Sequence, residues 1–314
     1  MPASARLLLA ALIGVGGVLG ACTEPSADWL GPGGTVAVHR APFADDAFGR
    51  AVSVWRPPGY DTTRADGYPV LYVQGSRPLL RADGTTRRAL DTLARRVEAG
   101  RLPPVLVVGL PRGERRLREV LPRVPFYLQP DSVWRPFRRR RGRPLADAYL
   151  QYLYEEVTAF VNRRYHTDPA ASRTLIAGTG VDGLFALYAV AKIPFAFGGA
   201  ALWSPDWTPG RPGADTAFVT SFRDYLAGQW GALRSARLYL DHVAGAREAF
   251  APHRAVLDSF VRARGLPADR WAVRPVGRRD SSWPGRVEAA LRFLLDRPPP
   301  RDDRFFNPFP PSND

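Results

Sequence analysis

The 314-residue sequence is poor in the residues that build disulfides and metal sites. It contains one cysteine and four histidines. A single cysteine excludes an intramolecular disulfide framework and a cysteine-rich zinc site. The histidines, His39, His166, His242 and His253, are scattered along the chain. We therefore expect neither a bound metal ion nor a cofactor. No apolar run reaches the roughly 18 residues of a membrane span, which argues against a polytopic membrane protein.

Lysine is almost absent, although the chain is strongly basic. Lys192 is the only lysine among 44 basic residues, which face 30 acidic ones and give a formal charge of +14. Such an arginine bias, together with 31 prolines, reflects genome composition as much as selection for anionic partners. The composition, 45% hydrophobic and 24% charged, is that of a globular protein and excludes disorder of the whole chain. We expect no nucleic-acid partner.

The N-terminus has the pattern of an export signal. Arg6 precedes an apolar core from Leu7 to Ala21, too short for a comfortable transmembrane helix and typical of a secretory signal peptide, here residues 1–21. The core ends in Leu-Gly-Ala before Cys22, which resembles the lipobox of bacterial lipoproteins. Acylation of Cys22 would anchor the exported chain to a membrane of the cell envelope. A plain signal peptide followed by a chance cysteine is the alternative.

The exported part is predicted to be one α/β domain, residues 34–296. Residues 22–33 are expected to be a lipidated N-terminus and flexible tether, and residues 297–314 a proline-rich disordered tail. Short apolar runs alternate with stretches of helical periodicity, which predicts a mainly parallel sheet opened by two antiparallel strands. We expect strands at 36–39, 51–55, 69–73, 105–108, 174–177, 200–203, 238–240 and 271–276, and helices at 85–99, 147–165, 182–192, 246–264 and 286–296.

One strand-to-helix junction has the pattern of a nucleophile elbow. The strand at 174–177 runs into Gly-Thr-Gly-Val-Asp-Gly at 178–183, and a helix follows. Arg-Pro-Pro-Gly-Tyr at 56–60, Tyr-His-Thr-Asp-Pro at 165–169, Leu-Trp-Ser-Pro at 202–205 and Trp283 stand around it in order. Together these segments resemble the putative-esterase family of α/β-hydrolases, which includes esterase D-like and enterochelin esterase-like proteins. The resemblance implies an α/β-hydrolase fold with helices on both faces of the sheet.

The catalytic positions that this resemblance implies are substituted. The family's catalytic serine falls on Gly180, and glycine has no side chain that a base could activate. The family's histidine falls in the window 277–283, which contains no histidine and has Arg278 or Arg279 in its place. A guanidinium does not act as a base. The family's acid falls on Glu248, which would have no imidazole to orient. The sequence therefore predicts an inactive domain that acts as a binding or scaffolding module.

An active esterase with a rearranged catalytic set is the competing interpretation. Ser204 and Thr179 are nearby hydroxyls, and His242 with Glu248 would complete such a set, although Thr179 precedes the tip of the elbow. Donors for an oxyanion would be expected around Gly75 and Val181. Asp182 takes the place of the second elbow glycine. We interpret it as a first-turn acid stabilised by the helix dipole, whose charge would also oppose an oxyanion.

The remaining signal consists of two groups of basic residues. One group lies in the loop after the strand at 105–108 and contains Arg112, Arg115, Arg116 and Arg118, and the other is a run of Arg138, Arg139, Arg140 and Arg141. Loops at the carboxyl ends of strands border the ligand crevice in this fold, so the run could form an anion-binding rim for envelope ligands. A solvated arginine-rich surface is the simpler interpretation.

Overall fold

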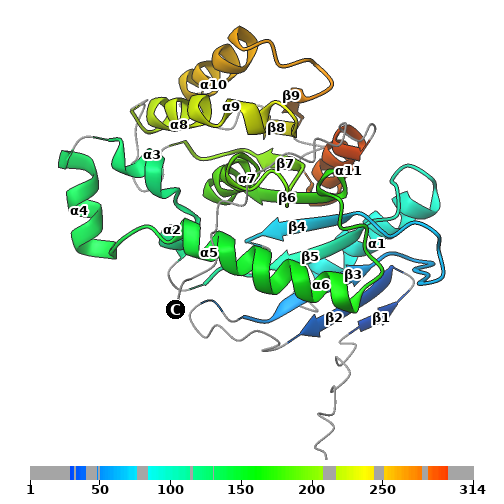
Figure 1. The fold of residues 1–314 in the computed structure, drawn as a ribbon. Coiled ribbons are helices and arrows are strands. Elements are labelled where there is room, and N and C mark those ends of the chain that lie inside the picture. Colours follow the sequence, from blue (N-terminus) through cyan, green and yellow to red (C-terminus); the bar gives the residue numbers. More distant parts are fainter. Residues whose placement is uncertain are drawn as a thin grey trace, which may run out of the picture.

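The computed structural model describes residues 29–31, 33–39, 48, 50–75, 84–113, 116–129, 131–207, 217–243, 251–277 and 282–295. Its centre is a sheet whose nine described strands lie in the order β1-β2-β3-β5-β4-β6-β7-β8-β9 (Figure 1). The strands are β1 Trp29–Gly31, β2 Gly34–His39, β3 Val52–Arg56, β4 Val70–Gln74, β5 Leu106–Leu110, β6 Thr174–Thr179, β7 Gly199–Trp203, β8 Arg237–Val243 and β9 Trp271–Val276. All pairs from β5 to β9 are parallel, whereas β1, β2 and β3 pair antiparallel.

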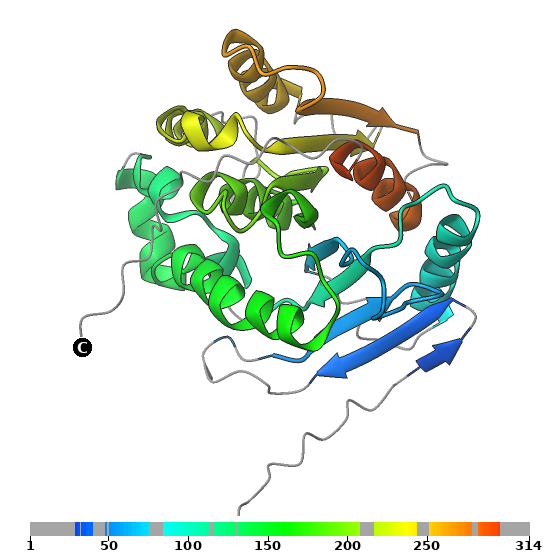
Figure 2. The same cartoon turned by 45° about the vertical axis from the view of Figure 1, so that its right-hand side comes forward.

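Helices cover both faces of the sheet (Figure 2). Helices α1 and α11 pack on one face, and α5, α6, α7 and α8 are among those on the other. A π-helical segment, Leu153–Thr158, joins α5 to α6. The bounds are α1 Gly84–Glu98, α2 Arg116–Val120, α3 Arg123–Tyr127, α4 Asp131–Arg141, α5 Ala146–Tyr152, α6 Ala159–Arg164, α7 Val181–Lys192, α8 Ala217–Gly228, α9 Trp230–Leu233, α10 Ala251–Ala263 and α11 Trp283–Leu295. The predicted α/β-hydrolase fold is confirmed.

The segment predicted to be a tether contains an additional strand. Trp29–Gly31 form β1, which pairs with β2 so that Gly31 lies opposite Gly34. The glycine-rich stretch had been interpreted as a linker, but glycine is equally typical of the tight connection of a hairpin. Gly34 has a φ of +92°, and a Cβ there would lie 2.3 Å from the carbonyl oxygen of Arg56. The glycine therefore permits close packing of the hairpin on β3.

Helix α7 lies at the centre of the domain. Every residue from Val181 to Ala191 is buried, because the sheet lies beneath the helix while α2 and α9 also contact it. A helix that is apolar on nearly all sides is stable only in such an enclosed position. The start of α7, and with it the elbow, is thus held by packing from several directions.

No helix in the described part of the chain is long and apolar enough to cross a bilayer.

Candidate active site

The junction between β6 and α7 has the geometry of a nucleophile elbow. Gly180 has φ +65° and ψ −127°, and its N–H donates to the Trp203 carbonyl oxygen at 3.1 Å. Its own carbonyl oxygen accepts from the Gly183 N–H at 3.0 Å and so begins α7. Glycine adopts this left-handed conformation without the Cβ penalty that other residues incur.

There is room for a side chain at the tip of the elbow. A Cβ built on Gly180 meets only the Cβ of Asp206, at 3.9 Å. In contrast, a Cβ on Gly178 would lie 2.3 Å from the backbone carbonyl carbon of Asp182. Close packing therefore requires glycine at 178 but not at 180. At 180 the glycine keeps the elbow free of backbone strain but carries no side chain that could act as a nucleophile.

An ion pair fills the region predicted to hold oxyanion donors. Asp182 is fully buried, and its Oδ2 accepts from Nε and Nη2 of Arg112 at 3.0 and 2.9 Å. The pair lies against Gly75, where a Cβ would be 2.4 Å from Asp182 Oδ2 and 2.8 Å from Arg112 Nε. Asp182 is thus a first-turn acid, as expected, but its carboxylate is paired with an arginine beyond β5. A developing oxyanion beside Gly75 and Val181 would meet that carboxylate.

A second buried ion pair lies at the ends of β7 and β8. Asp241 is fully buried and accepts from Arg286 at the start of α11, with Nε 3.0 Å from Oδ2 and Nη2 also bonded to Oδ1. Burial raises the pKa of the Asp241 carboxyl above its usual value, and the hydrogen bonds from Arg286 lower it in part. Neither residue was among the predicted site residues. The only sequence signal was an aspartate at the end of an apolar strand.

Ser204 belongs to the same cluster as this ion pair. Its N–H donates to the carbonyl oxygen of Asp241 at 3.0 Å, and Arg286 Nη2 donates to its Oγ at 3.1 Å. Ser204 has φ +47°, the one positive φ of a non-glycine residue in the part of the chain that the structure describes. An arginine cannot remove the proton of a serine hydroxyl, so this contact does not activate Ser204.

The strand register brings three predicted residues to one level of the sheet. Thr179 lies opposite Trp203, and Trp203 opposite Asp241. The next residues along these strands are therefore Gly180, Ser204 and His242. Among the described residues, the Ser204 hydroxyl accepts a hydrogen bond from Arg286, and the structure shows none between Ser204 and His242. Thr179 is exposed at the end of β6. Cys22, Glu248 and Arg278 lie outside the described residues.

The arginine run lies on a helix and not in a loop. Arg138–Arg141 form the exposed last turn of α4, which lies at the outer edge of the molecule in Figure 1. Arg135 and Arg138 lie 5.7 and 6.0 Å from the centre of the Trp134 ring. We expected a possible anion-binding rim here and predicted no helix. Arginines in a last turn instead gain from the negative end of the helix dipole, which favours this helical placement.

No metal site emerges from the described side chains, among which no three His, Cys, Asp or Glu residues lie close enough together to hold an ion. The described polar groups near the carboxyl ends of the strands include the two ion pairs and Ser204. This arrangement offers hydrogen-bond donors and fixed charges.

Several solved structures share this fold, and some of them are esterases by name. The BES protein from Bacillus cereus matches with a TM-score of 0.61 and 15% identity over 85% of this chain and 96% of that one. The siderophore hydrolase EstA from Aspergillus nidulans matches with a TM-score of 0.59 and 19% identity over 83% and 94% of the two chains. For the enterobactin esterase FES from Shigella flexneri the TM-score is 0.57 and the identity 16%, over 87% of this chain and 61% of that one.

Sequence comparison agrees with the likeness of fold. No curated protein matches the chain. The profile of the family described as Putative esterase matches residues 47–286, a range that includes the elbow, both ion pairs and Ser204. The chain belongs to the Putative esterase family.

Proposed function

We propose that this protein is an exported, lipid-anchored member of the family that no longer hydrolyses esters and acts as a binding module at the cell envelope. The observation that carries the proposal is Gly180 at the tip of the elbow, where the geometry of a nucleophile position is kept and the nucleophile is missing. Triad members act as a unit, so loss of the nucleophile alone typically costs on the order of 10⁶-fold in turnover.

Two further features support the loss of catalysis. The window 277–283 contains no histidine, so a serine at 180 would have no base at the family's position. The Asp182 carboxylate lies against Gly75. The negative charge that develops on the substrate oxygen in the transition state is stabilised by hydrogen-bond donors, and a carboxylate at this place would oppose it. The test is the turnover of short-chain p-nitrophenyl esters, which we expect at background. Efficient turnover would favour the competing function, a carboxylesterase that uses Ser204 with His242 and Glu248.

Anchoring through Cys22 gives the first prediction. The apolar core and lipobox-like ending imply acylation, and two or three acyl chains hold a protein stably at a membrane. After expression in a bacterial host, the unaltered chain is expected in the detergent phase of a two-phase separation, and Cys22→Ala in the aqueous phase. Thr23→Ala, next to the lipidation position, should behave like the unaltered chain. Aqueous partitioning of the unaltered chain would contradict lipidation.

The basic turn of α4 gives the second prediction. Arg139, Arg140 and Arg141 are exposed and make no ion pair within the described part of the chain. We propose that this turn contacts anionic lipid headgroups of the membrane that carries the anchor. Replacement of Arg138–Arg141 by glutamine removes four positive charges. It should therefore reduce the amount of signal-free protein that sediments with phosphatidylglycerol vesicles at least severalfold. The measurement is made at low salt, because salt screens contacts between exposed charges. The matched control replaces four exposed arginines elsewhere, namely Arg95, Arg163, Arg234 and Arg262. An equal loss of vesicle binding in both variants would contradict the proposal, because it would show that only the total positive charge matters.

A further inference from the structure

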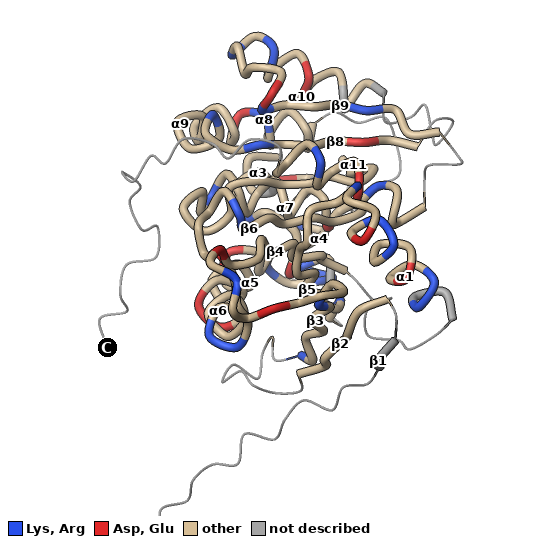
Figure 3. The backbone as a smooth tube through the Cα atoms, turned by 90° about the vertical axis from the view of Figure 1, so that its right-hand side faces the viewer, with Lys and Arg blue, Asp and Glu red and all other residues tan. Residues whose placement is uncertain are grey.

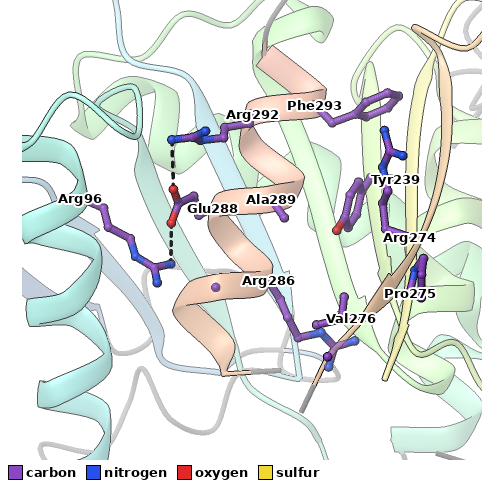
Figure 4. A pocket seen from close by; sticks show the side chains of 12 residues that line it. Arg96, Tyr239, Arg274, Pro275, Val276, Arg286, Glu288, Ala289, Arg292 and Phe293 are labelled. Carbon is purple, nitrogen blue, oxygen red and sulfur yellow. Dashed lines mark ion pairs between the residues drawn. The ribbon is translucent and has the colours of Figure 1, made fainter. Parts of the chain in front are cut away.

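A groove of about 630 Å³ lies at the edge of the sheet, between α11, α1 and strands β8 and β9 (Figure 4). It is on the face opposite α7, because α1 and α11 cover that face. Figure 3 shows basic positions on both of these helices. The groove reaches the clustered ion pair at the strand ends through Arg286, which lines it and also contacts Asp241.

Positive charge exceeds negative charge in the lining of this groove. Arg96, Arg274, Arg286 and Arg292 line it with a single acid, Glu288. Glu288 is already engaged by Arg96 Nη1 at 2.9 Å and by Arg292 Nη2 at 3.2 Å. Arg274 is exposed, and its guanidinium has neither an ion pair nor a hydrogen bond with any described residue. The groove therefore presents a guanidinium that is available to a ligand.

Tyr239 also lines this groove, as a largely buried side chain whose hydroxyl is a second potential hydrogen-bond donor. Asp241 lies opposite Arg274 in the register of β8 and β9, and Tyr239 precedes Asp241 by two residues, so all three share one face of the sheet. Burial raises the pKa of the Tyr239 hydroxyl to about 12, although the nearby Arg286 and Arg274 lower it in part. The hydroxyl thus stays protonated at physiological pH and can donate to an anion.

An apolar wall accompanies these donors. Phe293 and Ala289 of α11 and Val276 of β9 line the groove. Figure 4 shows Tyr239, Arg274 and Phe293 together on one side of α11, with the Glu288 ion pairs on the other side of the helix. A pocket with a few convergent polar groups on an apolar wall is the usual form of a small-molecule site.

We propose that this groove binds a small organic anion whose carboxylate or phosphate head contacts Arg274 and Tyr239 and whose apolar body packs on Phe293. The guanidinium fork matches either head group in a bidentate arrangement. The site is separate from the elbow, so anion binding does not depend on whether the elbow hydrolyses esters. Failure of one experiment leaves the other unaffected.

The test is calorimetric titration of the full chain in detergent with three probes: phenyl phosphate, benzoate and inorganic phosphate. Benzyl alcohol serves as the neutral control and should not bind. Arg274→Ala should weaken binding of the preferred aromatic anion by about tenfold or more, because the variant loses a charged hydrogen bond to the ligand. Tyr239→Phe should weaken it severalfold. Arg163→Ala makes the same change of charge on exposed α6 and should leave binding unchanged.

The pattern among probes identifies the head group. Stronger binding of phenyl phosphate than of benzoate assigns a phosphate ligand, and the reverse assigns a carboxylate. Weaker binding of inorganic phosphate than of phenyl phosphate shows the contribution of the apolar wall. Absence of binding by all three anions overturns the proposal, as does an equal effect of Arg274→Ala and Arg163→Ala.

Discussion

Gly180→Ser alone is expected to restore no measurable ester hydrolysis. The hydroxyl would fit, because a Cβ at 180 is 3.9 Å from its nearest neighbour. No histidine occupies the family's base position, however, and general-base assistance typically contributes about 10²–10⁴-fold. The Asp182 carboxylate beside Gly75 also remains. Hydrolysis of p-nitrophenyl acetate by this variant should therefore match that of the unaltered chain.

Restoration requires the base and the oxyanion region as well. Gly180→Ser with Arg278→His, and then with Asp182→Gly, should raise turnover stepwise, with the triple variant highest. Efficient hydrolysis by Gly180→Ser alone would reveal a base already in place, such as His242. The serine at φ +65° should cost about 1–3 kcal/mol of unfolding free energy. Gly265→Ser is a matched control for this strain, because Gly265 has φ +68° and open space around its Cβ position.

Removing Arg286 is expected to cost about 3–5 kcal/mol of unfolding free energy at pH 8, because it leaves a buried carboxylate unpaired. The Asp241 side chain is fully buried, and that of Arg286 is 11% exposed. Urea unfolding of Arg286→Met measures the effect. Arg262→Met is the matched control, since Arg262 pairs with Asp258 but is 77% exposed. Such surface pairs contribute about 0–1 kcal/mol.

The pH dependence of this loss identifies its cause. Burial raises the pKa of Asp241 in the folded chain above its unfolded value, and loss of Arg286 should raise it further. The folded state then binds more protons than the unfolded state, so stability falls as the pH rises through the window between these two pKa values. The deficit of Arg286→Met relative to the unaltered chain should be smaller at pH 5 than at pH 8. Asp241→Asn added to Arg286→Met should recover stability at pH 8. An equal deficit at both pH values would mean that lost packing, and not a buried charge, destabilises the variant.

Comparison at each pH with the unaltered chain is necessary because His39 also titrates. Its Nε2 lies 2.6 Å from the Tyr165 hydroxyl, and burial with the nearby Arg164 and Arg56 lowers its pKa to about 4. The unfolded chain binds more protons than the folded chain between about pH 4 and 6.5, so stability falls as the pH decreases through that window. Both proteins share this contribution, and the difference between them removes it.

The features that were predictable from the sequence are local ones. The elbow could be located because its glycines, the strand before it and the helix after it lie within 19 consecutive residues, 174–192. The parallel strands were recognisable as apolar runs, since both of their faces are buried. Asp182 could be placed in the first turn of α7 because it follows Gly180 by two residues and begins the predicted helical stretch.

The partners of the charged site residues could not be predicted. Arg112 and Asp182 are 70 residues apart, and Asp241 and Arg286 are 45 apart. Each pair depends on strand order and register, which no local pattern encodes. With 44 basic residues in the chain, many arginines were equally plausible partners for each acid. The helix that ends with the run at 138–141 was not predicted, because its polarity hid the helical pattern.

Covalent labelling with a fluorophosphonate probe tests the absence of a catalytic nucleophile most directly. The probe reports an activated hydroxyl whichever residue carries it, independently of the substrate. The full chain in detergent should show no increase in intact mass after incubation, and it should release p-nitrophenol from p-nitrophenyl acetate at the rate of buffer alone. The triple variant Gly180→Ser, Arg278→His, Asp182→Gly should label more than the unaltered chain. Stoichiometric labelling of the unaltered chain at Ser204 or Thr179, with efficient turnover, would contradict the account and establish an active esterase.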